Sequence, residues 1–145
     1  MTSLLHFFGN LYLRRHNIEK AQQYYQSSLD LLNEVAPSHV VISSVHYKLA
    51  YIAWECKQPD SALMHLWNGY GIAEARNSRG EMARILRKQA QILAETALSP
   101  SQEKDAETLR TKAEVLRVEL QGPDNISDDD SLAAYDLLVC GYHRF

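Results

Sequence analysis

Small residues recur in pairs along the chain at a nearly constant interval. The pairs are Gly9 with Ala21, Ala50 with Ala62, and Ala90 with Ala106. The members of the first two pairs stand twelve residues apart and those of the third sixteen, and the first members are separated by 41 and 40 residues. A helical hairpin that recurs at a near-constant period is typical of an α-solenoid, and small residues let its two backbones approach closely. The sequence therefore predicts three antiparallel helical hairpins in a row.

Apolar residues spaced three and four apart predict helices on both sides of each small-residue pair. Pro37 ends one segment, Ser38 is a candidate N-cap, and both Ser78-Arg79-Gly80-Glu81 and Ser99-Pro100-Ser101-Gln102 resemble capping boxes. A strand could compete only at Val40-Val41-Ile42, where the helical period nevertheless continues. The expected helices cover about residues 3–16, 18–35, 39–57, 59 to the mid-seventies, 78–97, 100–121 and 131–143.

These segments group into an all-α architecture with one small appendage. We expect the hairpins to span about residues 2–36, 38–77 and 78–122, so that the repeat region is 1–122. Residues 123–130 are rich in aspartate and predict an acidic linker. Residues 131–145 then predict a C-terminal helix that caps the apolar face of the last hairpin.

The first hairpin resembles the tetratricopeptide repeat (TPR). It carries Leu5, Phe8, Gly9, Tyr12, Ala21, Tyr25 and Ser28 where that family favours Trp, Leu, Gly, Tyr, Ala, Phe and Ala. The second hairpin matches through His46, Leu49, Ala50, Ala53, Ala62, Leu66 and Gly69, and the third has a longer loop and Arg110 where an aromatic residue is usual. The resemblance covers about residues 2–121 and is to long-period variants. It implies a right-handed solenoid whose first helices line a concave groove. The alternative is a generic bundle of three hairpins.

Composition and motifs argue against several classes of function. The formal charge of -3 and the pI near 6.0 do not suggest a nucleic-acid partner. The longest apolar run, Leu49 to Trp54, is far short of the roughly 20 residues of a membrane span, and the N-terminus lacks a secretory pattern. Two distant cysteines favour a reducing, cytoplasmic location. Because no phosphate loop, metal-ligand spacing or nucleophile motif is present, we expect no enzyme activity, metal or cofactor.

Candidate peptide-binding residues lie on the first helix of each expected hairpin. They are His6, Asn10, Tyr47, Lys48, Tyr51, Arg84, Arg87 and Lys88. A groove with aromatic walls and a basic end suits an acidic peptide or a C-terminal carboxylate. The set resembles a degenerate carboxylate clamp of chaperone-binding TPR proteins: Asn10 matches, Arg84 and Lys88 are exchanged, and His6 and Lys48 replace the usual lysine and asparagine. The alternative is that the basic residues form a solvated helix face.

Three functional hypotheses follow from this pattern. The first is a protein-interaction module that binds a partner's peptide or helix, as part of a larger scaffold or regulatory protein. The second is a structural element that self-associates through its N-terminal hairpin, which begins near Met1 and carries Leu4, Leu5, Phe7 and Phe8. The third is a helical-repeat regulator that senses a peptide or small molecule.

Overall fold

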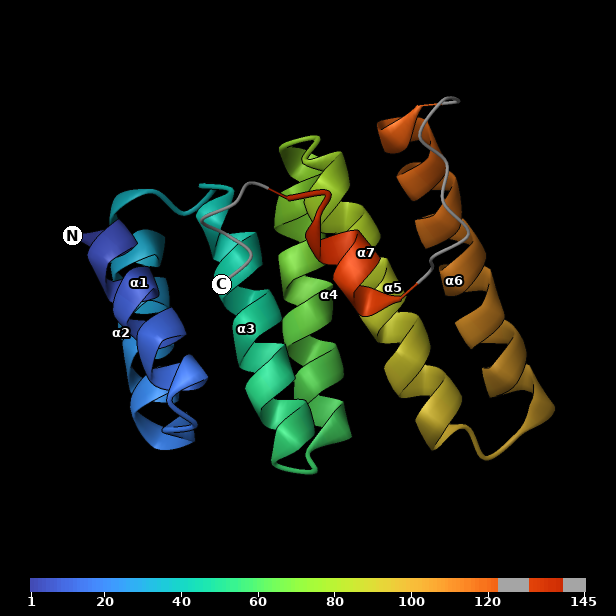
Figure 1. Ribbon diagram of the computed structural model, residues 1–145, viewed down its shortest axis with the longest axis horizontal. Coiled ribbons are helices and arrows are strands. Elements are labelled where there is room, and N and C mark those ends of the chain that lie inside the picture. The colour runs from blue at the N-terminus through green and yellow to red at the C-terminus, as the bar shows by residue number, and fades with distance from the viewer. Residues whose placement is uncertain (123–130, 140–145) are drawn as a thin grey trace. The chain divides into compact units, whose positions relative to one another are not determined.

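The computed structural model describes residues 1–122 and 131–139 (Figure 1). Within these ranges the chain forms seven helices and no strand, which confirms the all-α class. The helices are α1 (Thr2–Arg14), α2 (Ile18–Val35), α3 (Val41–Glu55), α4 (Pro59–Ala75), α5 (Arg79–Thr96), α6 (Pro100–Gln121) and α7 (Leu132–Asp136). The chain divides into two compact units, residues 1–76 and a second unit that begins at Asn77.

The turns that close the first two hairpins share one backbone pattern. His16 and Lys57 both adopt positive φ, at 57° and 60°. The amide of His16 donates to Leu13 and that of Asn17 to Tyr12. The same two bonds recur 41 residues later, where Lys57 donates to Trp54 and Gln58 to Ala53. This is the Schellman arrangement that ends many helices. The sequence period therefore has a counterpart in backbone geometry.

The helix starts differ in part from the sequence-based expectation. Ser99 accepts a hydrogen bond from the amide of Gln102 and so caps α6, but the Gln102 side chain accepts from the amide of Leu98, one residue before the N-cap amide that a capping box uses. Ser78 stands at the N-cap position of α5 but makes no side-chain capping bond. Ser38 does not cap α3, because that helix begins at Val41, whose amide donates to the Nδ1 atom of His39.

The first unit is built around an apolar core between α2 and α3. Each of its four helices packs on the next along the chain. The core consists of Ala21, Tyr25, Leu29, Leu32, Val41, Ile42, Val45, Leu49 and Ile52. Gly9 of α1 is needed for close approach, since a Cβ atom there would lie 2.5 Å from the Cε1 atom of Tyr25. The periodic apolar stripes therefore become the contact surface of this unit.

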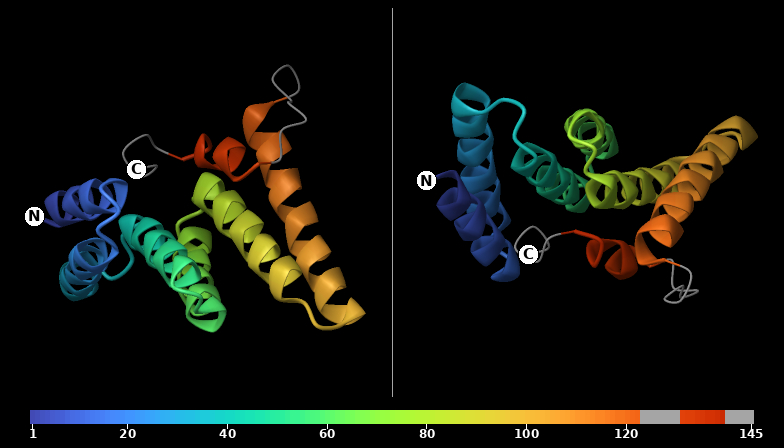
Figure 2. Two further views of the ribbon diagram at one scale, coloured as in Figure 1. Left: turned by 60° about the horizontal axis from the view of Figure 1, so that its bottom comes forward. Right: turned by 90° about the horizontal axis from the view of Figure 1, so that it is seen from above.

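The second unit consists of the antiparallel helices α5 and α6 with the short α7 packed on α5 (Figure 2). The contact surface between the long helices contains the small residues Ala83, Ala90, Ala106 and Ala113, all buried. The helix expected over residues 131–143 is shorter, because α7 ends at Asp136. The chain then turns, and the backbone of Leu138 lies directly against Gly80. Residues 140–143 of that expectation, and the linker 123–130, lie outside the described residues.

Candidate functional site

Two of the expected groove residues belong to the interior of the first hairpin. His6 is fully buried, and its ring lies 5.7 Å from the ring of Tyr25 between centroids. Asn10 is also buried and accepts a hydrogen bond of 2.6 Å from the Tyr25 hydroxyl. Burial raises the pKa of this tyrosine, so the hydroxyl stays a donor at ordinary pH. Both side chains therefore stabilise the contact between α1 and α2.

The expected groove residues on α3 differ in accessibility. Tyr47 and Lys48 are buried, with exposed fractions of 7% and 8%. Tyr51 is exposed, and partial burial together with the nearby Glu55 carboxylate raises its pKa. Of these three side chains, Tyr51 presents the largest exposed fraction to a ligand.

Arg84 and Lys88 contact other groups of the second unit. The fully buried Arg84 guanidinium pairs with Glu81 at 2.7 Å and with Asp136 of α7 at 3.5 Å. The Lys88 ammonium donates to the Gln91 side chain at 3.0 Å. Two carboxylates of the chain therefore neutralise the charge of Arg84, which the sequence analysis placed among the peptide-binding residues. The sequence pattern placed Arg84 and Lys88 on one face but did not reveal that α7 supplies a carboxylate to that face.

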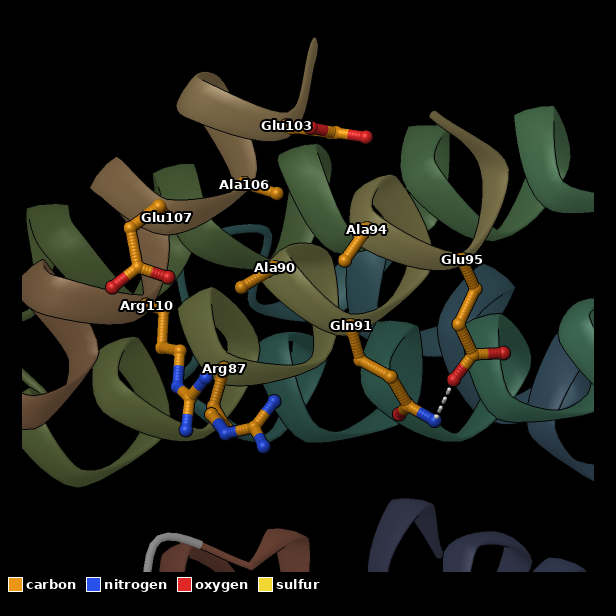
Figure 3. A pocket seen from close by; sticks show the side chains of 9 residues that line it. All are labelled: Arg87, Ala90, Gln91, Ala94, Glu95, Glu103, Ala106, Glu107 and Arg110. Atoms are coloured by element: carbon orange, nitrogen blue, oxygen red, sulfur yellow. Dashed lines mark hydrogen bonds between the residues drawn. The ribbon is translucent and has the colours of Figure 1, made fainter. Parts of the chain in front are cut away.

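Arg87 lines a pocket between α5 and α6 (Figure 3). The pocket has a volume of about 260 Å³, and small side chains from both helices border it. Its lining residues are Arg87, Ala90, Gln91, Ala94, Glu95, Glu103, Ala106, Glu107 and Arg110. The alanines leave space that longer side chains would fill. Thus Ala90 and Ala106, which the sequence analysis identified as small residues of the third hairpin, also border a hollow.

Charge is unevenly distributed around this pocket. In the view of Figure 3, the side chains of Arg87 and Arg110 both extend toward one end of the pocket, with Glu107 above Arg110. At the other end Gln91 donates a hydrogen bond of 2.8 Å to Glu95. A paired-guanidinium end is suited to a carboxylate, because each guanidinium offers a fork of N–H donors. An acidic opposite end is suited to a basic or amide group of the same ligand.

A histidine pair that the sequence analysis did not identify joins α3 to α4. The Nδ1 atoms of His46 and His65 lie 3.1 Å apart, and the ring centroids are 5.4 Å apart. Burial and the neighbouring His65 lower the pKa of His46 to about 4, and burial also lowers the pKa of His65. One neutral ring therefore donates its proton to the other. The Ala50–Ala62 pairing contained the signal, because that register places residue 46 opposite residues 65 and 66.

Searches of the described residues found neither a metal centre nor a membrane span. Residues 1–122 and 131–139 contain no group of three or more His, Cys, Asp or Glu side chains that could hold a metal ion. No helix in those ranges is both long enough and apolar enough to cross a bilayer. Comparisons with known protein families, curated proteins and solved structures found no match to this chain.

Proposed function

We propose that this chain is a TPR-like protein-interaction module that binds an extended segment of a partner protein. The pocket between α5 and α6 holds an acidic group of that segment, either a side chain or a C-terminal carboxylate. The TPR-like arrangement is supported by the packing of α1 on α2, α2 on α3, α3 on α4 and α5 on α6, and by the turn geometry that recurs after 41 residues.

The observation that carries the proposal is that Arg87 and Arg110 line the same alanine-bordered hollow. A carboxylate placed between two guanidinium groups gains charge-assisted hydrogen bonds, and the hollow buries apolar atoms next to it. Peptides of this kind must be ordered on binding, so a single short segment binds with modest affinity.

A peptide titration tests the proposal. A fluorescent peptide with two acidic residues near a free C-terminus is titrated with the wild-type chain and with Arg87→Ala/Arg110→Ala. Loss of both guanidinium groups is expected to weaken binding by at least tenfold. The matched control is Lys104→Ala/Lys112→Ala, which removes two exposed positive charges from the same hairpin. Equal weakening by both double variants, or by neither, would contradict a site at this pocket.

A second candidate function is self-association through the first hairpin. Leu4 and Phe7 are 50% and 59% exposed and lie three residues apart, so they share one face of α1. Light scattering over a concentration series, with Leu4→Ser/Phe7→Ser as the comparison, tests this candidate. A wild-type chain that stays monomeric throughout the series would exclude it.

A further inference from the structure

The side chain of Tyr135 anchors α7 in the second unit. It is fully buried, and its hydroxyl donates a hydrogen bond of 3.0 Å to the carboxylate of Glu114 on α6. Arg117 also donates to that carboxylate, with Nε 2.8 Å from Oε2 and Nη2 2.5 Å from Oε1. Burial and the Glu114 hydrogen bond raise the pKa of Tyr135 to about 12, so the phenol remains a donor. The Tyr135 side chain thus joins the ion pair between Glu114 and Arg117 on α6.

Asp136 makes a second specific contact, to a different helix. Its carboxylate lies 3.5 Å from the Arg84 guanidinium of α5, which Glu81 also holds. Asp136 itself is partly exposed, whereas Arg84 is buried. A tyrosine followed directly by an aspartate therefore contacts two helices: the Tyr135 hydroxyl binds α6, and the Asp136 carboxylate binds α5.

The segment that carries these two residues is too short to be helical by itself. A helix of five residues has hardly any internal hydrogen bonds, and isolated helices shorter than about 12 residues are marginal in water. Its order comes from contacts with the hairpin, which include the backbone of Leu138 against Gly80 and the burial of Ala134 and Val139. In this respect α7 resembles a bound peptide ligand.

We propose that residues 131–139 are an intramolecular ligand that covers a peptide-binding surface on α5 and α6. We call this surface the α7 seat and define it by Gly80, Glu81, Arg84, Glu114 and Arg117. Its partner is a short amphipathic helix of another protein that carries a tyrosine followed by an aspartate. Such a partner must displace α7, so competition from residues 131–139 lowers the apparent affinity for the partner. This inference does not depend on the pocket at Arg87 and Arg110.

The test adds the segment as a separate peptide to the 145-residue chain. A fluorescent peptide with the sequence of residues 131–139 is titrated into the wild-type chain and into Tyr135→Ala/Asp136→Ala, which keeps the α7 seat but loses its own anchor. The double variant is expected to bind the peptide at least tenfold more tightly, because the internal competitor is weakened. A short tether gives that competitor an effective concentration in the millimolar range, so peptide is added up to about 1 mM.

Two controls show whether binding occurs at the α7 seat. A peptide with the tyrosine and aspartate replaced by phenylalanine and asparagine is expected to lose most of its affinity. In the Tyr135→Ala/Asp136→Ala background, the further change Arg84→Ala is expected to weaken binding, whereas Lys104→Ala/Lys112→Ala, which removes two exposed charges from α6, is not. Circular dichroism verifies that every variant remains helical.

Hydrogen exchange of the wild-type chain gives an independent measurement. If α7 leaves its seat by local opening, its amides exchange faster than those of α5 and α6. The proposal is overturned if the double variant binds the peptide no better than wild type up to 1 mM. It is also overturned if α7 amides are protected as strongly as those of α5, because displacement would then require global unfolding.

Discussion

Different kinds of interaction stabilise the interior of each of the two units. The core of the first unit is an apolar cluster of α2 and α3 residues that includes the fully buried Tyr25. In the second unit the largest fully buried side chains include Arg84 and Arg117, each paired with a glutamate of its own helix. Apolar burial is non-directional, whereas buried ion pairs depend on geometry. The second unit therefore depends more on the geometry of its polar side chains than the first does.

The largest effect is expected at Tyr25. Changing Tyr25→Ala empties a fully buried site that faces Gly9 and removes the donor to Asn10, so we expect a loss of about 3 to 5 kcal/mol in the free energy of unfolding. Tyr25→Phe keeps the ring and is expected to cost about 1 to 2 kcal/mol, because the Asn10 oxygen loses this partner. Urea unfolding followed by circular dichroism measures both values. Similar losses for the two variants would show that packing does not dominate this core.

The second-largest effect is expected at the buried ion pair between Glu81 and Arg84, and it tests the contrast between the two units. Arg84→Ala leaves Glu81 buried without this partner and is expected to cost about 3 kcal/mol. Replacing both partners, as in Glu81→Leu/Arg84→Met, is expected to change the free energy of unfolding by only about 1 kcal/mol, because two apolar side chains need no counter-charge.

The exposed ion pair between Arg79 and Glu119 is the matched control for this cycle. Arg79→Ala is expected to cost less than about 0.5 kcal/mol, since solvent screens exposed pairs. A double variant at Glu81 and Arg84 as unstable as Arg84→Ala alone would contradict the idea that the unpaired charge causes the loss.

The third effect depends on pH and is expected in the first unit. The pKa of His46 is about 4 in the folded chain, against an ordinary value of 6.5. Between these values the unfolded chain binds more protons, so stability is complete above pH 6.5 and falls as the pH decreases toward 4. Because the pair is only partly buried, we expect a loss of about 1 to 2 kcal/mol.

Chemical unfolding at pH 7 and pH 4.5 measures this loss. His46→Leu/His65→Leu cannot take up these protons, so its stability is expected to vary less with pH over this interval. An equal dependence in wild type and double variant would assign the effect to other groups.

The periodic apolar residues were sufficient to predict the long helices. The expected bounds of α2 and α6 are those observed, and those of α1, α3 and α5 differ by one or two residues. The predicted C-terminal end of α7 was wrong, because a tertiary contact determines where this helix ends. After Asp136 the chain turns, and the Leu138 backbone lies against Gly80. Local propensity contains no information about that contact.

The candidate site was harder to predict, because charged residues on one face of a helix usually indicate that this face is exposed to solvent. Arg84, Arg87 and Lys88 share a basic stretch of sequence, yet Arg84 is an interior ion-pair partner and Arg87 lines a pocket. What separates them is the position of carboxylates from Glu81, Asp136 and the pocket rim. Spacing along one helix shows which side chains share a face, but not which neighbouring helix neutralises them.

The matching turns at His16 and Lys57 have a consequence for the evolution and engineering of the chain. Both junctions present the same backbone conformation to the helix that follows, so the segment between them, residues 17–57, has equivalent ends. A second copy of that segment could be joined after Lys57 without inventing a new type of connection. The left-handed backbone conformation of His16 and Lys57 thus allows the repeat to be extended by one whole hairpin at a time.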